Sequence, residues 1–298
     1  MAISVPFKYS PIERVKFSDP DLEEKLAKGQ PLVMTDCAIT AELAKRWTVD
    51  YLASHIEPDF SCSVFHSKNN IFQYWDNAKN KGQYKFDPPT TKTEMKFREF
   101  VAKMRAGKSK KGEAEGGGAE EGEGGVAKGA GGEGGGRGQY YLQQSLVVGV
   151  GDQILHDFKM VDWTRLFAVQ GAVGFGDLTS NLLLVGEHGN TTPLHYDEQE
   201  NLFAQLHAHK HIFLFPPAAW PHLFPYPLHH PCDRQSMLPS CRRTWDIPPS
   251  PSSSSPPSSS PSSSPVAGQP QQGPAFPGAE AAHALHVCLN PGEMLYIP

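Results

Sequence analysis

The stretch Asn201-Leu-Phe-Ala-Gln-Leu-His-Ala-His-Lys-His-Ile-Phe-Leu-Phe-Pro-Pro217 contains two short apolar runs on either side of a polar turn. Similar runs occur at Tyr140–Leu146 and Leu178–Gly186, each bounded by Gly, Pro, Asn or Asp. Helical periodicity is weak between residues 139 and 246, so we expect helices mainly in the N-terminal flank. Short strands at close spacing predict a mainly β fold, either a sandwich or a barrel.

Two low-complexity segments interrupt this pattern. Residues 106–138 are rich in Gly and Glu, and residues 247–277 alternate Pro with Ser. Neither composition can bury enough apolar surface to offset chain entropy, so both are predicted to be disordered insertions. What remains is an N-terminal flank (1–105), a β core (139–246) and the start of the closing strands (278–298).

The N-terminal flank contains signals for both strands and helices. Residues 31–36 have the apolar run and turn end of a strand, and residues 41–47 have helical spacing. Residues 93–104 would place Met95, Phe97 and Phe100 near one side of a further helix. We expect that side to pack on the core.

Composition excludes several classes of function. The 298 residues carry 27 Lys+Arg against 32 Asp+Glu, a formal net charge of -5, which argues against a nucleic-acid partner. No apolar run approaches the roughly 18 residues of a membrane span, and the N-terminus does not resemble a secretory signal. Five cysteines without a C-x-x-C pair fit a reducing compartment. We therefore expect no membrane partner and a cytoplasmic or nuclear location.

The segment Gly189-Asn-Thr-Thr-Pro-Leu-His195-Tyr-Asp197-Glu-Gln-Glu-Asn201 carries the strongest chemical signal. In an extended chain, residues two apart share a face, so His195 and Asp197 should project together. An imidazole and a carboxylate presented in this way, completed by a distant second histidine, form the facial triad of non-haem Fe(II) oxygenases. A bare H-x-D pattern is common, and the alternative is a surface histidine beside a turn aspartate.

Lys210 strengthens this interpretation. The sequence separation between Asp197 and Lys210 is long enough for a turn and a returning antiparallel strand. That return would bring the Lys210 ammonium beside the metal-binding pair His195 and Asp197. By parity it shares an otherwise apolar face with Ile212 and Leu214, where a dicarboxylate cosubstrate would supply a counter-charge. The alternative is an edge-strand lysine in solvent. His207, His209 and His211 fall on the other face, and we interpret them as solvated rather than as a metal cluster.

These residues resemble the JmjC family of 2-oxoglutarate oxygenases, and within it the asparaginyl hydroxylases of the hypoxia response. The similar segments are Thr192–Gln205, Lys210, Leu214–Pro217 and Phe224–Ser236, together with the outlying Gln73–Asp76 and Tyr141–Leu146. The resemblance implies a double-stranded β-helix, or jelly roll of the cupin type, that binds Fe(II), 2-oxoglutarate and O2. It also implies a protein substrate, hydroxylated on asparagine, aspartate or histidine in exposed segments such as ankyrin-repeat loops.

The resemblance also implies a role for individual residues. His195 and Asp197 match the iron ligands. Lys210 and Thr192 match the residues that hold the distal carboxylate of 2-oxoglutarate, and Tyr141 and Asn201 match further cosubstrate contacts. The positions that grip the peptide substrate are matched by Tyr74, Gln143, Gln199 and Arg234.

The chain departs from the family pattern at its C-terminus. In the family, a Pro-Gly-acidic turn such as Pro291-Gly-Glu293 starts the strand that leads to the second iron histidine, which would lie beyond Pro298. His283 and His286 precede that turn, so neither matches the missing ligand. We expect the sequence to be a fragment of a longer enzyme, and the alternative is a natural short form. The resemblance implies that the full-length enzyme is a homodimer formed through C-terminal helices.

Two rival functions remain open. A catalytically inactive JmjC-like module would recognise a peptide without oxidising it. Lysine demethylation would need a pocket for a methylated cation, and the match through Cys232-Asp-Arg-Gln235 argues against it.

Overall fold

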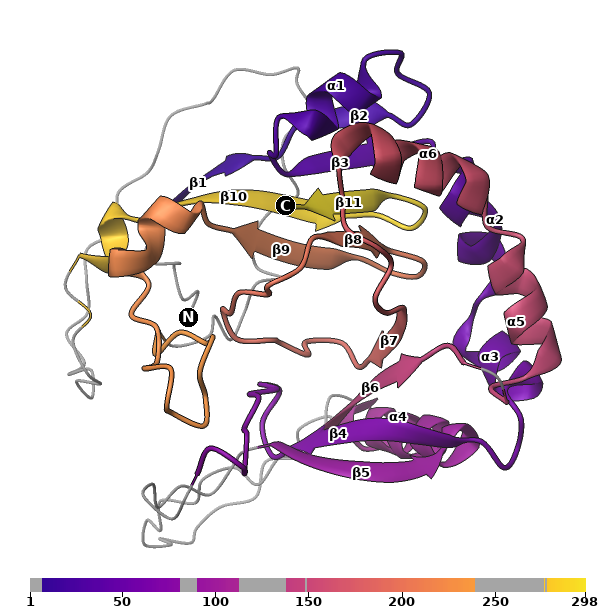
Figure 1. Ribbon diagram of the computed structural model, residues 1–298. Coiled ribbons are helices and arrows are strands. Elements are labelled where there is room, and N and C mark those ends of the chain that lie inside the picture. Colours follow the sequence, from indigo (N-terminus) through magenta and orange to yellow (C-terminus); the bar gives the residue numbers. More distant parts are fainter. Residues whose placement is uncertain (1–6, 81–89, 113–137, 148, 239–275, 277) are drawn as a thin grey trace, which may run out of the picture.

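Four antiparallel strands form the lower layer of the molecule in Figure 1. The computed structural model describes residues 7–80, 90–112, 138–147, 149–238, 276 and 278–298. The lower strands, in spatial order, are β5 (Thr90–Lys96), β4 (Ser61–Ser67), β6 (Gln139–Ser145) and β7 (Leu182–Gly186).

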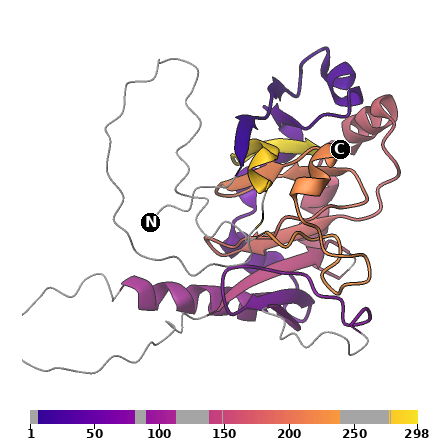
Figure 2. The ribbon, with the colours of Figure 1, turned by 90° about the vertical axis from the view of Figure 1, so that its left-hand side faces the viewer.

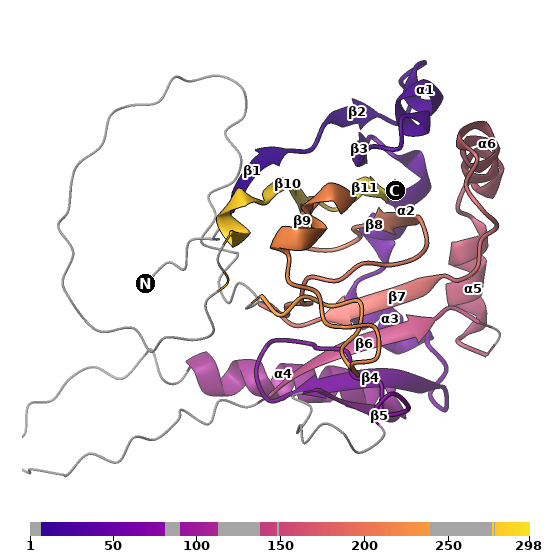
Figure 3. The same cartoon turned by 60° about the vertical axis from the view of Figure 1, so that its left-hand side comes forward.

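Two further sheets form the upper layer in Figures 1 to 3. One consists of β1 (Lys8–Pro11), β10 (His283–Leu289) and β9 (Lys210–Leu214), and the other of β2 (Arg14–Lys16), β3 (Leu32–Thr35), β11 (Met294–Ile297) and β8 (Asn201–Ala204). The segment that joins β7 to β8 runs between the two layers in Figures 1 and 3. These layers confirm the mainly β, jelly-roll class predicted from the sequence.

Helices cover one side of the layers, on the right in Figure 1. They are α2 (Ala38–Arg46), α3 (Val49–His55), α5 (Asp152–Lys159) and α6 (Trp163–Val173), with α1 (Leu22–Ala27) above them and α4 (Phe97–Gly112) against the lower sheet. Two short 3-10 helices, η1 (Pro217–His222) and η3 (Ala279–Ala281), contact each other.

The expectation that helices are confined mainly to the N-terminal flank was wrong. Helices α5 and α6 lie between β6 and β7, inside the predicted β core. The sequence does carry their signals: Ile154 and Phe158 recur at helical spacing, and the Asp162 side chain accepts a hydrogen bond from the backbone N–H of Arg165 as an N-cap.

Strand alternation places the main core on one face of the lower sheet. Val64 and Leu142 are fully buried against Phe100 of α4 and Ile154 of α5. Their neighbours along the same strands, including Tyr141, fall on the opposite face by alternation. That opposite face is available to line a site between the layers.

A buried carboxylate fastens α5 to the N-terminal helices. Asp157 accepts hydrogen bonds from Arg46 Nη1 at 2.6 Å, Trp47 Nε1 at 3.0 Å and Tyr51 Oη at 2.6 Å. Burial alone would raise the pKa of this carboxyl, but its hydrogen bonds outweigh that effect and lower the pKa to about 2. These contacts join α5 to residues that lie more than 100 positions earlier in the sequence.

Two element boundaries differ from the prediction. The helix expected over residues 93–104 begins only at Phe97, because residues up to Lys96 pair with β4 along the whole of β5. Helix α4 then continues to Gly112, past the expected start of the first insertion at residue 106. The rest of that insertion up to residue 137 lies outside the described residues, and so does the second insertion (247–277) except for residue 276.

The upper layer has two different faces. Val287 and Leu289 of β10 pack with Leu295 of β11 on the inner face. On the other face, His286 is 3% exposed, stacks on Phe213 and lies with Nε2 at 3.1 Å from Nδ1 of His211. His207 and His209 are exposed as expected, whereas His211 is part of this aromatic cluster rather than solvated.

Replacing Phe100 by alanine should destabilise the fold by about 3–5 kcal/mol, because a fully buried aromatic ring leaves a cavity in the main core. Urea unfolding followed by circular dichroism measures this loss. Phe167 on α6 is 51% exposed and provides the matched control, since Phe167→Ala should cost less than about 1 kcal/mol. Equal losses in the two variants would contradict the assignment of the core.

Acid should destabilise the fold through His286. Burial first, and then the neighbouring His211 and Arg14, lower the pKa of His286 to about 4. The unfolded chain therefore binds a proton that the folded chain does not, and the free energy of unfolding should fall by up to about 3 kcal/mol between pH 6.5 and pH 4. His286→Phe should lose this part of the pH dependence in urea titrations, whereas the exposed His207→Phe should retain it. An unchanged pH profile in His286→Phe would refute the prediction.

Candidate functional site

The segment between β7 and β8 is held in place by its backbone. The N–H of Ser236 donates to the carbonyl of Leu194 at 2.8 Å, and the N–H of Tyr196 donates to the carbonyl of Arg234 at 3.0 Å. His195 thus lies opposite Gln235 in an isolated antiparallel bridge. A second bridge joins Thr191 to Ile71. The segment is extended but belongs to no sheet, and its site residues are positioned by two loops distant in sequence.

His195 and Asp197 lie on the same side of this segment. Nε2 of His195 is 3.8 Å from Oδ2 of Asp197, and the side chains are 42% and 58% exposed. Nδ1 of His195 is 2.8 Å from the carbonyl oxygen of Pro193, an acceptor, so Nδ1 carries the proton in this hydrogen bond. That tautomer leaves the Nε2 lone pair free beside the carboxylate, which is how metal-ligating histidines are oriented.

A pocket of about 230 Å³ opens beside this pair. It brings together six of the predicted site residues, namely Tyr74, Gln143, Thr192, His195, Asp197 and Arg234. The remaining lining residues are mostly aromatic or polar: Phe65, Phe72, Gln73, Thr90, Pro193, Tyr196, Asp233 and Gln235. The pocket therefore has an aromatic wall and both signs of charge.

The other predicted site residues lie outside this lining. Gln199 and Asn201 are exposed at the end of the segment, and Asn201 begins β8 opposite Ile297 of β11. Tyr141 is buried in β6 with its ring 5.3 Å from that of Phe72, and burial raises its pKa to about 12. Its hydroxyl stays neutral and can donate a hydrogen bond.

Lys210 begins β9 on the inner, apolar face of the upper layer, as its parity predicted. It pairs with Leu289 of β10, and its Nζ lies 4.6 Å from the ring centroid of Phe203. No carboxylate of the described chain forms an ion pair with it, and loss of hydration lowers its pKa to about 8. Lys210 is not among the residues that line the 230 Å³ pocket.

Two lining residues of the pocket, Asp233 and Gln235, were not assigned from the sequence, and neither was Lys79, which contacts Asp233. The Gln235 amide clamps the backbone of Tyr74, accepting from its N–H at 3.1 Å and donating to its carbonyl at 2.7 Å. Lys79 donates to Asp233 Oδ2. Asp233 and Gln235 flank Arg234 in the quoted motif, but their partners lie more than 150 residues away.

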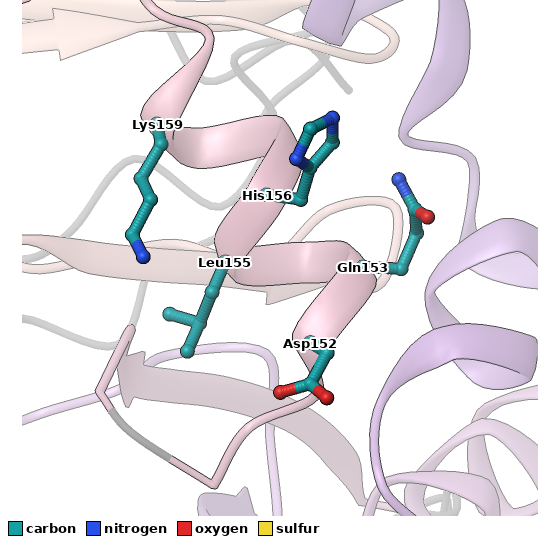
Figure 4. Close-up of a pocket in the computed structure, with 5 residues that line it drawn as sticks. All are labelled: Asp152, Gln153, Leu155, His156 and Lys159. Carbon is teal, nitrogen blue, oxygen red and sulfur yellow. The ribbon is translucent and has the colours of Figure 1, made fainter.

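A second depression runs along α5 and has a different character. Figure 4 shows its lining residues, Asp152, Gln153, Leu155, His156 and Lys159, radiating from the helix rather than converging on one point. It offers no shared centre for chemistry.

The donor atoms fit a metal only in part. Imidazole and carboxylate are the donor types that Fe(II) takes in oxygenases. Within the described parts of the chain, however, no group of three His, Cys, Asp or Glu side chains is close enough to hold a metal ion. His283 and His286 have other partners, Ser10 and His211.

The model of the family described as a cupin-like domain matches residues 19–298, which is most of the chain. Among the described residues, no helix is long and apolar enough to cross a membrane.

Removing the Lys210 ammonium should stabilise the folded chain when no ligand is present. Lys210→Met should raise the free energy of unfolding at pH 7 by about 1–3 kcal/mol, because it removes the cost of taking the charged ammonium out of water. The lowering of the Lys210 pKa to about 8 reflects this cost. The unfolded chain keeps its proton to higher pH, so wild type should also gain stability between pH 8 and pH 10.5, and the variant should not. The exposed Lys16→Met on β2 serves as control in urea titrations. A destabilised Lys210→Met would contradict this prediction.

Proposed function

Because the chain belongs to the cupin-like domain family, whose members are often 2-oxoglutarate oxygenases, we propose that it is an Fe(II)- and 2-oxoglutarate-dependent protein hydroxylase. The observation that carries the proposal is Lys210, an ammonium on an apolar face that no carboxylate of the described chain neutralises. A half-buried cation without an ionic partner loses hydration at a cost in free energy, so a site that keeps one is suited to an anionic ligand.

The distal carboxylate of 2-oxoglutarate meets this need. It would pair with Nζ of Lys210, and its remaining oxygen positions accept hydrogen bonds from hydroxyl groups. The sequence resemblance assigns that role to Thr192, with Tyr141 and Asn201 as further contacts. The neutral hydroxyl of Tyr141 suits it as a donor.

His195 and Asp197 would hold the iron through Nε2 and Oδ2. When bound, Fe(II) with 2-oxoglutarate and O2 supplies the oxidising power that inserts one oxygen atom into a C–H bond while the cosubstrate becomes succinate and CO2. The contribution of the chain is placement: the Pro193 carbonyl fixes the His195 tautomer, and the Gln235 bridge fixes its backbone.

The 230 Å³ pocket is the proposed site for the target side chain. Arg234 carries a guanidinium 5.8 Å from the Tyr74 ring, and Gln143 adds an amide on the lower sheet. These positions, with Gln199, are similar to those that grip the peptide in factor inhibiting HIF, an asparaginyl hydroxylase. We therefore propose asparagine as the main target, with aspartate and histidine as further ones.

One observation favours a second candidate function. Among the described residues, no third His, Cys, Asp or Glu lies close enough to His195 and Asp197 to complete the proposed iron site. A chain with this donor set would bind iron weakly and could serve as a peptide-binding module without turnover.

The direct test of the proposal is succinate release. The purified protein, incubated with Fe(II), 2-oxoglutarate and a peptide from an ankyrin-repeat loop, should release succinate and yield peptide heavier by one oxygen atom, as followed by mass spectrometry. Omission of either small molecule is the control. Peptide binding without succinate would support the inactive module, and a longer form of the protein without turnover would refute the hydroxylase.

Two variants should separate the metal site from the cosubstrate site. Asp197→Ala removes a ligand and should abolish Fe(II) binding, whereas Lys210→Ala should weaken 2-oxoglutarate binding at least tenfold and leave metal binding within twofold. Equilibrium dialysis and calorimetry measure the two affinities under argon. If Asp197→Ala retained Fe(II) binding, or if Lys210→Ala retained 2-oxoglutarate binding, the assignment would be wrong.

A further inference from the structure

The hydroxyl group of Tyr141 has no hydrogen-bond partner among the described residues, although Tyr141 is only 7% exposed. Unlike the fully enclosed, unpaired oxygens of Ser63 and Asp233, this hydroxyl keeps some accessible surface. Polar groups in buried surroundings are nearly always paired, so the hydroxyl is suited to donate to a ligand. The orientation of the ring then decides whether the hydroxyl meets that ligand.

Gly186 lies directly opposite Tyr141 in the antiparallel pair of β6 and β7. Side chains in such a cross-strand pair normally lie against each other, but Gly186 has none. A β-carbon added at Gly186 would lie 3.1 Å from Cδ2 and 3.4 Å from Cε2 of the Tyr141 ring. The ring therefore lies over the Gly186 backbone, in space that the β-carbon of any other residue would take.

The neighbours of the Tyr141 ring leave it little space to move. The same added β-carbon would lie 2.9 Å from Nδ2 of Asn190, which donates to the carbonyl of Tyr140 at 2.8 Å. Phe72, a buried residue that lines the 230 Å³ pocket, packs against the ring in a T-shaped arrangement. A methyl group at Gly186 would thus displace the Tyr141 ring, break the Asn190 hydrogen bond, or do both.

We propose that Gly186 is a positioning residue of the cosubstrate site, because the absence of its β-carbon lets the Tyr141 ring lie across β7 with its hydroxyl directed at 2-oxoglutarate. The inference rests on the proposed function for the identity of that ligand. It goes further in assigning a role to a residue that carries no functional group and that acts only through Tyr141.

Calorimetric titration of 2-oxoglutarate, with Fe(II) present and under argon, tests the inference. Gly186→Ala should weaken 2-oxoglutarate binding at least about fivefold, and the larger Gly186→Val at least about twentyfold, while Fe(II) binding stays within about twofold of wild type. Gly171→Ala makes the same change where an added β-carbon meets nothing within 4 Å, and it should leave both affinities within about twofold. Unchanged 2-oxoglutarate affinity in both Gly186 variants would overturn the proposal.

The Tyr141 hydroxyl provides a readout that a merely structural role of Gly186 would not change. Tyr141→Phe removes the hydroxyl and keeps the ring. Because Gly186 acts by directing this hydroxyl, adding Gly186→Ala to Tyr141→Phe should weaken 2-oxoglutarate binding by less than about twofold further. A further loss as large as that in the wild-type background would show that the substitution damages the site in another way, and the proposal would be wrong.

A fluorine label separates failure of this inference from failure of the proposed function. With 3-fluorotyrosine in place of Tyr141, the fluorine resonance of the ligand-free protein should shift in Gly186→Ala and stay in place in Gly171→Ala. An unchanged resonance in Gly186→Ala would refute the role of Gly186 without any ligand. Failure of 2-oxoglutarate to bind wild type would instead refute the proposed function, and with it 2-oxoglutarate as the ligand of this hydroxyl.

Discussion

The site depends on one short backbone pairing, between residues 194–196 and residues 234–236. It holds His195 in extended conformation outside any sheet. The side chain of Gln235 extends the contact to Tyr74, so three segments from different parts of the chain meet at one pocket. This pairing keeps the segment with His195 and Asp197 from being a solvated loop. It also brings Tyr74 and Arg234 into the lining of the same pocket.

The two layers of strands provide the rigid frame for that pairing. The lower sheet buries one face against the helices and leaves the face with Tyr141 and Gln143 toward the site. The upper layer carries Lys210 on its apolar inner face, beside Phe203. Burial acts on each polar group according to its surroundings: it raises the pKa of Tyr141 and lowers that of Lys210, and in Asp157 several hydrogen bonds overcome it.

Much of the fold followed from local patterns. Apolar runs predicted β3, β6, β7, β8 and β9, and parity along β9 placed Lys210 with Ile212 and Leu214. Helices α5 and α6 were not predicted, because the short apolar runs on either side of them resemble strands, although α5 has an amphipathic spacing and α6 has Asp162 as its N-cap. The start of α4 was misplaced because pairing with β4 takes residues 90–96 into a strand, and such pairing partners are not visible in local sequence.

For the site, the sequence by itself determined which chemical groups are present and which neighbours share a face: His195 with Asp197, and Lys210 with apolar side chains. Tertiary structure alone decided that Asp233 pairs with Lys79, that the Gln235 side chain binds the backbone of Tyr74, and that Oδ1 of Asp233 has no hydrogen-bond partner among the described residues. The physical reason is the sequence range over which each kind of interaction acts. Side-chain direction follows from backbone geometry over a few residues, whereas burial and hydrogen-bond pairing depend on groups that only folding brings together.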